Sequence, residues 1–240
     1  MSTTKAIILA AGKSSRLYPL TLERPKCLLE LNGKPIIQWQ IEILRKIGIS
    51  DIVVVVGYKK ETIINELGKN VRFRHYDDFD KTNNLHTLYS VRDELNQDCL
   101  CLFSDVLTDL PILESLAFGR GDFTLLVNTR QVRDDTIRII KEGDLIKRIG
   151  SHLTVEESDG NYLGICKISK KGCELLNAQM TKLIKNHRDD YFTIAIDKLS
   201  IVGNDIYSKE LEDSTWLEVD TSNDYDKAKK NFHLIKNTLQ

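Results

Sequence analysis

The feature that most restricts the fold is the alternation of short apolar runs with helix-like segments through the first half of the chain. Ile52–Val56 is a run of β-branched residues, which is typical of a strand buried on both faces of a parallel sheet. Strands are predicted at Lys5–Leu9, Ile52–Val56, Val71–Tyr76 and Cys99–Phe103, and helices at residues 35–48, 61–67 and 84–95. We therefore predict an α/β fold with a doubly wound, mostly parallel, Rossmann-like sheet and helices on both faces.

The second half departs from this alternation. A hairpin signal at residues 142–144 predicts a small β-hairpin insertion, and Thr221 with Asp224 three residues later predicts a capped final helix. No linker, internal repeat or low-complexity segment interrupts the chain, so we expect a single domain over residues 1–240. Strands are expected at Phe123–Asn128, Ile137–Lys141, Leu145–Ile149 and Tyr162–Ile168, with a short last one ending at Asp220, and helices at Ser169–Ile184 and Tyr191–Leu199.

The composition argues against several classes of partner. The chain has 240 residues and a formal net charge of −1, so we expect neither nucleic acid nor a membrane surface as a partner. The N-terminal residues are polar and carry no apolar signal-peptide region. The five cysteines form no Cys-x-x-Cys pair, which fits a reducing compartment, and we expect a cytoplasmic protein.

A loop rich in small residues follows the first strand. Backbone N–H groups of small residues can close on an anion, while Arg16 and Lys26 supply positive charge at the two ends of the loop. This combination predicts a nucleoside triphosphate site, with an ordinary surface loop as the alternative. Because Gly12 is the only glycine there, the loop is neither a dinucleotide fingerprint nor a P-loop. The residues expected to contact nucleotide in this loop are Leu9, Ala10, Ala11, Gly12, Ser14 and Ser15.

Two aspartates follow predicted strands at their carboxyl ends. Asp105 comes directly after Cys99–Phe103, and Asp220 ends the last short strand before a helix. Ligands of open α/β sheets bind beyond these strand ends, and Mg²⁺ takes one or two carboxylates together with phosphate oxygens. The pair therefore predicts a magnesium site, with helix or turn capping as the alternative. Glu218 shares a strand face with Asp220 and is a neighbouring candidate.

The loop after the first strand, which contains Gly12, resembles the signature of the sugar-nucleotide pyrophosphorylase superfamily of nucleotidyltransferases. Ser14 stands where that signature has a second loop glycine, and serine adopts a positive φ less readily. The resemblance implies that Asp105 and Asp220 hold a catalytic Mg²⁺ cofactor. The matching positions are Gly12, Ser15, Arg16, Pro19, Thr21, Pro25 and Lys26.

The charges in a nucleotidyl transfer reaction suggest a role for each of the two cations, Arg16 and Lys26. An acceptor oxygen attacks the α-phosphorus of the triphosphate and pyrophosphate leaves, so metal and cations can lower the barrier without a protein nucleophile. We assign Arg16 to the triphosphate and the leaving pyrophosphate. We assign Lys26, the second catalytic candidate, to the acceptor and the α-phosphate.

The segment from Asp80 to Ser90 resembles the Asn-Asn-x-x-Ser-Leu segment of cytidylyltransferases that activate phosphocholine and related alcohol phosphates or phosphonates. Asn83, Asn84 and Ser90 are accordingly expected to bind nucleotide, since asparagine offers both a donor and an acceptor to a cytosine edge. A helix N-cap at Asn83 or Asn84 is the alternative interpretation. The stretch from Trp216 to Tyr225 is similar to that group as well.

The resemblance implies transfer of CMP from CTP to a small phosphorylated or phosphonylated alcohol, such as phosphocholine or 2-aminoethylphosphonate. A sugar-1-phosphate nucleotidyltransferase using UTP or dTTP and a non-catalytic nucleotide-binding regulatory subunit stay open as alternatives. A homodimer also stays open. Candidates for an aromatic cage around a choline group are Tyr162, Tyr191, Phe192 and Trp216, and Asp77, Asp78 and Asp80 form an acidic cluster that could attract an amine.

Overall fold

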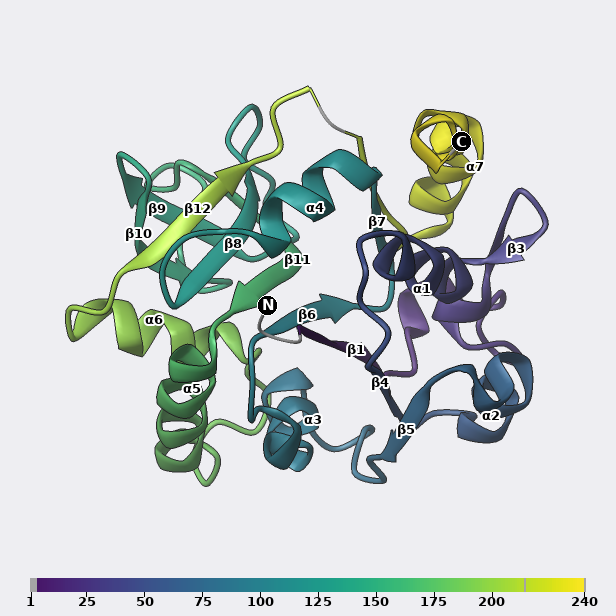
Figure 1. Ribbon diagram of the computed structural model, residues 1–240, viewed down its shortest axis with the longest axis horizontal. Coiled ribbons are helices and arrows are strands. Elements are labelled where there is room, and N and C mark those ends of the chain that lie inside the picture. The colour runs from purple at the N-terminus through teal and green to yellow at the C-terminus, as the bar shows by residue number, and fades with distance from the viewer. Residues whose placement is uncertain (1–3, 214, 240) are drawn as a thin grey trace.

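The computed structural model describes residues 4–213 and 215–239. Its centre is a nine-stranded sheet in the order β5-β4-β1-β6-β11-β8-β12-β10-β9 (Figure 1). Two small ladders, β2–β3 and β7–β13, lie outside it. The strands are β1 Lys5–Ala10, β2 Glu30–Leu31, β3 Lys34–Pro35, β4 Ile52–Val56, β5 Arg72–His75, β6 Cys99–Phe103, β7 Val106–Thr108, β8 Phe123–Asn128, β9 Arg138–Glu142, β10 Leu145–Gly150, β11 Gly160–Ile168, β12 Ile206–Glu210 and β13 Trp216–Glu218.

The four strands predicted in the first half form the parallel part of the sheet. In β1, Ile8 pairs with Val54 of β4 on one side and with Leu102 of β6 on the other, and both pairings are parallel. β5 adds to β4 in the same direction. The carboxyl ends of these strands therefore lie along one edge, where the sequence predicts the nucleotide loop and Asp105.

The other part of the sheet is mostly antiparallel, so the sheet as a whole is mixed and not mostly parallel as predicted. β11 runs antiparallel to both β6 and β8, and β9 and β10 form the predicted hairpin at the far edge of the sheet. β12, which the sequence analysis did not predict, pairs in parallel with β8. Only the first residue of β12, Ile206, is fully buried, so the strand lacks the apolar run that marks β1 and β4.

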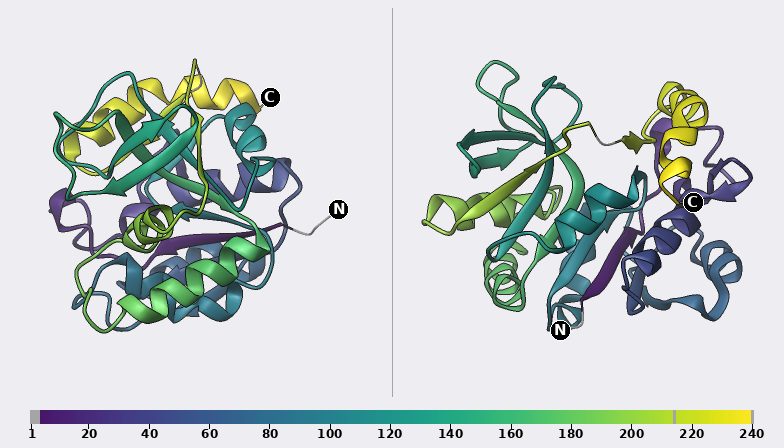
Figure 2. Two further views of the ribbon diagram at one scale, coloured as in Figure 1. Left: turned by 90° about the vertical axis from the view of Figure 1, so that its left-hand side faces the viewer. Right: turned by 45° about the horizontal axis from the view of Figure 1, so that its top comes forward.

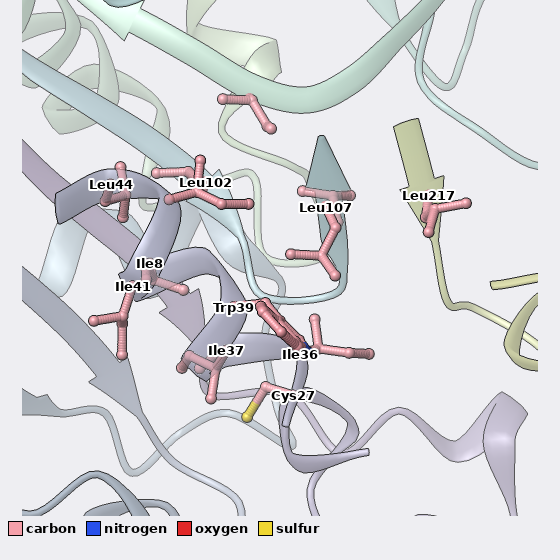
Figure 3. Close-up of a cluster of buried hydrophobic side chains, with 14 of the residues drawn as sticks. Ile8, Cys27, Ile36, Ile37, Trp39, Ile41, Leu44, Leu102, Leu107 and Leu217 are labelled. Carbon is pink, nitrogen blue, oxygen red and sulfur yellow. The ribbon is translucent and has the colours of Figure 1, made fainter. Parts of the chain in front are cut away.

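Helices cover both faces of the sheet, as predicted. Ile7 and Ile8 of β1 point to opposite faces, and each belongs to a separate apolar cluster. Figure 3 shows Ile8 and Leu102 beside Ile41 of α1, while Figures 1 and 2 show α7 and α5 on opposite sides of the sheet. The helices are α1 Ile36–Lys46, α2 Lys60–Leu67, α3 Asn84–Ser90, α4 Leu110–Ala117, α5 Lys170–Leu183, α6 Thr193–Ile201 and α7 Ser222–Lys236.

Two helices differ from the prediction. α4 was missed, although the Asp109 side chain accepts a hydrogen bond from the Ile112 N–H in a regular N-cap. The predicted helix 84–95 is shorter, because α3 ends at Ser90 and a 3₁₀ turn, Arg92–Glu94, follows. The predicted cap of α7 is confirmed, since Thr221 and Asp224 form a capping box. In the described part of the chain no helix is both long and apolar enough to cross a bilayer.

The 3₁₀ turn after α3 carries a buried carboxylate that links three segments. Glu94 accepts a hydrogen bond from Lys5 Nζ of β1 at 2.8 Å and one from Arg72 Nη1 of β5 at 2.7 Å. The hydrogen bonds from Arg72, joined by those of Lys5, outweigh the effect of burial and lower the pKa of Glu94 to about 2. This ion group ties the amino end of β1 to the outermost parallel strand, β5.

Replacing Glu94 by glutamine should lower the free energy of unfolding by about 2 kcal/mol at neutral pH, because its charge-assisted hydrogen bonds with Lys5 and Arg72 become weaker. A carboxyl with a depressed pKa stabilises the fold fully above its ordinary value of 4.5 and loses that contribution as the pH falls towards 2. The stability difference between Glu94→Gln and the parent chain should therefore shrink over that range in urea unfolding curves.

The matched control is Asp93→Asn, which removes a neighbouring carboxylate that pairs with Arg74 on the surface at 2.7 Å. An exposed pair contributes at most about 1 kcal/mol, so this variant should follow the parent chain closely at each pH. A pH-independent effect of Glu94→Gln would contradict the proposed electrostatic link.

Candidate active site

A pocket of about 290 Å³ opens at the carboxyl ends of β1 and β6. The nucleotide loop, the start of α3, the β6–β7 turn and the end of β13 all contribute to its walls. The structure thus brings together most of the residues predicted from the sequence as site residues. The predicted residues that line the pocket are Leu9, Ala10, Ala11, Gly12, Ser14, Arg16, Lys26, Asn83, Asn84, Asp105 and Asp220.

The nucleotide loop turns sharply at Ser14. This residue has a φ of 53°, in the left-handed region that favours glycine, which is a physical reason for the glycine of the related signature. The Ser14 carbonyl accepts a hydrogen bond from Thr21 Oγ1 at 2.9 Å and one from the Leu17 N–H at 3.1 Å. Thr21 is fully buried and closes the loop from the far side, so the following 3₁₀ helix, Ser15–Leu17, presents Arg16 to the pocket.

The two aspartates meet because β7 and β13 form an antiparallel ladder. In it Glu218 pairs with Val106, and the Val219 N–H donates to the Asp105 carbonyl oxygen at 3.1 Å. The ladder therefore sets the turn that holds Asp105 directly beside the chain that leads to Asp220. Because β7 and β13 lie far apart in the sequence, only the folded chain brings these carboxylates together.

Lys26 lies between the two carboxylates. Its ammonium donates a hydrogen bond to Asp105 Oδ2 and another to Asp220 Oδ1, the latter at 2.7 Å, and the three side chains are 11–13% exposed. Burial opposes the charge on Lys26, but Asp105 and Asp220 outweigh it and raise its pKa above the ordinary value. Burial likewise opposes the charge on Asp220, yet Lys26, followed by Arg16, lowers the pKa of that carboxyl.

Glu218 completes a group of three carboxylates. Oxygens of Asp105, Glu218 and Asp220 lie within 4.8 Å of one another. Burial, followed by the charges of Asp105 and Asp220, raises the pKa of Glu218 to about 8. Arg133 Nη1 lies 3.1 Å from Glu218 Oε2 and partly balances this negative charge.

The donor set fits a hard divalent cation. Asp105 Oδ1 is buried and has no hydrogen-bond partner among the described residues. An unpaired buried carboxylate oxygen is costly, and an ion that prefers oxygen ligands would satisfy it. The oxygen chemistry of the three acids thus suits Mg²⁺ better than a soft metal that prefers sulfur.

Both predicted asparagines line the pocket, and both also hold a neighbouring loop. Asn83 caps α3 and donates from Nδ2 to the Asp189 carbonyl at 3.1 Å, while Asn84 Oδ1 accepts from the Phe192 N–H at 2.8 Å. The capping alternative is therefore correct for Asn83, alongside its place in the pocket wall. These contacts fix the segment 189–192, which includes Tyr191 of the pocket.

Ser15 and Ser90, also expected at the nucleotide, do not line the pocket. Ser15 is exposed, and Ser90 Oγ bonds the Thr87 carbonyl at 2.7 Å at the far end of α3. Because α3 advances about 1.5 Å per residue and turns every 3.6 residues, Ser90 lies more than a turn beyond Asn84, on another face. The pocket wall therefore includes neither serine, and their contact with nucleotide stays a prediction.

Residues 6–120 match a family model described as a MobA-like NTP transferase domain. The choline-phosphate cytidylyltransferase of Streptococcus pneumoniae is 31% identical, over 97% of this chain and 99% of that protein. The CTP:phosphoglutamine cytidylyltransferase of Campylobacter jejuni is 28% identical, over 91% and 96% respectively. The solved structure of CTP:phosphocholine cytidylyltransferase from Streptococcus pneumoniae has a TM-score of 0.82 and 27% identity, and the match covers 96% of this chain and 99% of that one.

This chain belongs to the nucleotidyltransferase family that contains these cytidylyltransferases. The enzyme class and the Rossmann-like α/β fold predicted from the sequence are both confirmed. The similarity to the two curated relatives extends over nearly the whole chain, including the second half that the family model does not match.

The wall of the nucleotidyltransferase pocket opposite the nucleotide loop depends on one buried arginine. Arg138, on β9, donates from Nε to the Leu153 carbonyl at 2.5 Å and from Nη2 to the Ser151 carbonyl at 2.7 Å. It also donates to the carbonyls of Arg133 and Asp134. Two loops are thereby joined, and the pocket residues 134–137 and Ser151 come from them. The sequence does not predict this clamp, because nothing in it marks Arg138 as buried.

The aromatic candidates of the nucleotidyltransferase separate into two groups. Tyr162 and Tyr191 line the pocket, where Phe103 packs against them at ring-centroid distances of 5.9 and 6.5 Å. Phe192 is fully buried, and the Trp216 Nε1–H donates to the Leu163 carbonyl at 3.1 Å, so neither lines the pocket. The acidic cluster also lies outside it, with Asp77, Asp78 and Asp80 paired to Lys60, Lys81 and Lys13.

Gly164 lines the pocket, and a substitution there tests how much the fold depends on its backbone conformation and on its contact with Phe103. Gly164 has a φ of 77° at the irregularity in β11, and a Cβ there would lie 2.9 Å from Phe103 Cδ2. Gly164→Ala should lower the free energy of unfolding by about 1–3 kcal/mol, because it combines backbone strain with a clash. Thermal denaturation followed by circular dichroism measures this. Gly143→Ala is the control, since Gly143 also has a positive φ, of 58°, but a Cβ there would lie in open space. Equal losses in the two variants would show that the contact with Phe103 contributes nothing.

Proposed function

We propose that this nucleotidyltransferase transfers CMP from CTP to a small phosphorylated or phosphonylated alcohol and releases pyrophosphate. The observation that carries the proposal is the convergence of Arg16 and Lys26 with Asp105 and Asp220 in one pocket at the carboxyl edge of the parallel strands. Two curated relatives that match over nearly the whole of both chains are cytidylyltransferases by name, which supports CTP as the nucleotide.

The proposed step is an in-line substitution at phosphorus. A phosphate or phosphonate oxygen of the acceptor forms a bond to the α-phosphorus, the bond from that phosphorus to the bridging oxygen breaks, and its electron pair leaves with pyrophosphate. Lys26 has a raised pKa, so in this proposal it stays protonated and acts as a fixed charge rather than as a base. Arg16 is 56% exposed in its side chain, which leaves the guanidinium accessible to a polyphosphate.

We propose Mg²⁺ as the cofactor, held by Asp105 and Asp220 with Glu218 beside them. When bound, the ion would neutralise phosphate charge and polarise the α-phosphoryl group. The chain's own cations have complementary tasks, since Lys26 would bring the acceptor and the α-phosphate together and Arg16 would orient the leaving pyrophosphate. The N–H groups of the loop that contains Gly12 and Ser14 would hold the nucleotide.

The part of the pocket wall that contains Tyr162 and Tyr191 is not purely aromatic, so the pocket is not shaped for choline alone. Two of the four cage candidates, Tyr162 and Tyr191, line the pocket, while Thr136 and Ser151 add hydroxyl groups to it. Asp135 pairs with Arg133 at 3.2 Å, so its charge is already partly balanced. An acceptor with its own hydrogen-bonding groups fits this mixed wall as well as a quaternary ammonium does.

Three further properties complete the proposal. We propose that residues 1–240 form one domain, a view supported by a central sheet with strands from both halves of the chain. A cytoplasmic location is supported by five free, buried cysteines. A homodimer remains a prediction.

Pyrophosphate release should be measured with CTP, UTP, dTTP and GTP against phosphocholine, phosphoglutamine, 2-aminoethylphosphonate, a polyol phosphate and glucose 1-phosphate. We expect turnover with CTP and at least one acceptor of the alcohol phosphate or phosphonate class, and none without a divalent ion. Turnover only with glucose 1-phosphate and UTP or dTTP would support the sugar-nucleotide alternative. No turnover in any combination would favour a non-catalytic nucleotide-binding role.

Removing the ammonium between the two aspartates should abolish most of the activity. Lys26→Met should lower kcat by about 10² or more, since electrostatic groups of this kind contribute roughly 3 kcal/mol or more to transition-state stabilisation. Steady-state kinetics with the best acceptor measures this. The control is Lys60→Met, which removes an ammonium that pairs with Asp77 on the surface at 3.1 Å and should leave kcat unchanged. A Lys26→Met enzyme with normal kcat would exclude the assigned role.

A further inference from the structure

A buried glutamine of α1 lies under the turn that holds Asp105. Gln40 is 3% exposed, and its Nε2 donates to the Phe103 carbonyl at 2.8 Å and to the Val106 carbonyl at 2.7 Å. Phe103 is the last residue of β6 and Val106 is the first residue of β7, and Asp105 lies in the turn between them. One amide nitrogen therefore fixes both sides of the turn.

The other half of the same amide has no partner. Gln40 Oε1 is buried and makes no hydrogen bond to any described residue. A buried oxygen without a partner costs free energy, and an apolar side chain of the same size would avoid that cost. The amide cannot gain by turning over, because its oxygen would then face the carbonyl oxygens of Phe103 and Val106. The two hydrogen bonds that Gln40 Nε2 donates are therefore the physical reason for an amide at this position.

We propose that Gln40 is a positioning residue that sets the placement of Asp105 for metal binding. This inference rests on the proposed function, because it assigns Gln40 a role towards the Mg²⁺ ligand. The turn is held from α1 by Gln40 and from β13 by the Val219 N–H, which donates to the Asp105 carbonyl at 3.1 Å. With the backbone fixed on both sides, the carboxylate of Asp105 keeps one position relative to Asp220.

Loss of the donors would act on the site through the backbone. Without them the carbonyls of Phe103 and Val106 would each lose a donor, so we expect the turn to shift or admit water. Metal sites need their ligands within about 0.5 Å of the productive position, and loss of a supporting partner typically lowers metal affinity about 10- to 100-fold. Gln40 itself touches neither metal nor substrate, so the expected defect is in metal affinity.

The test compares Gln40→Met, which nearly conserves volume, with Gln40→Glu, which replaces the donor nitrogen by an acceptor. The matched control is Gln38→Met, because Gln38 lies on the same helix and bonds Glu66 Oε1 at 2.9 Å on the surface. Binding of Mn²⁺ to the full chain without substrates is measured by electron paramagnetic resonance. We expect the Kd for Mn²⁺ to rise about tenfold or more in Gln40→Met and to stay unchanged in Gln38→Met.

A second readout separates positioning from packing. The Mn²⁺ concentration that half-activates the CTP reaction should rise in parallel with the Kd, and saturating Mn²⁺ should restore part of the rate. A Gln40→Met chain with a lower Tm but unchanged Mn²⁺ affinity would overturn the inference, because Gln40 would then only pack. If Gln40→Glu does not fold, Gln40→Met alone decides. Absence of CTP turnover with every acceptor in the parent chain would instead overturn the proposed function.

Discussion

The ammonium of Lys26 is the positive charge that holds the carboxylates of Asp105 and Asp220 together at the carboxyl edge of the parallel strands. Two aspartates from distant parts of the chain lie close together in a pocket where their side chains are 12–13% exposed. Without a cation between them they would repel each other strongly, because little water is present to screen them. Lys26 balances both, and Arg16 adds a second positive group to Asp220 at 3.2 Å. The loop that carries these two cations is therefore tied to the sheet through the same acids that suit a metal ion.

The two parts of the sheet have separate tasks in this nucleotidyltransferase. The parallel strands fix the edge where the nucleotide loop and the β6–β7 turn lie, as the connections of an α/β sheet require. The antiparallel part and the β9–β10 hairpin supply the opposite wall, which Arg138 holds through backbone carbonyls. Because most of the hydrogen bonds of Arg138 go to backbone carbonyls, this clamp depends little on the side chains of the loops that it holds.

Residues that bond the backbone explain most of what sequence reasoning missed. Arg138 and Gln40 are both buried, and each satisfies carbonyls of segments far away in the sequence. Nothing in their local pattern distinguishes them from a surface arginine or a helical surface glutamine. Ser90 lies outside the pocket for a related reason, since similarity of a motif does not say which side of a helix a residue faces. β12 lacks a clear apolar period, and its pairing with β8 decides its structure. α4 does carry a local signal, because Asp109 caps it and Ile112, Leu113 and Leu116 are buried at helical spacing.

The sequence by itself determined the strands β1, β4 and β6, the capped helix α7 and the family, and it identified four charged candidates for the site. These follow from continuous apolar runs, from a local capping pattern and from a motif short enough to be recognised in one stretch of chain. Only the tertiary structure decided that Asp105 and Asp220 meet, because the β7–β13 ladder that joins them is a pairing between distant segments. It also decided that Lys26 lies between them and that Glu218 joins them. Long-range pairings of this kind depend on which surfaces become buried together, and local sequence does not record that.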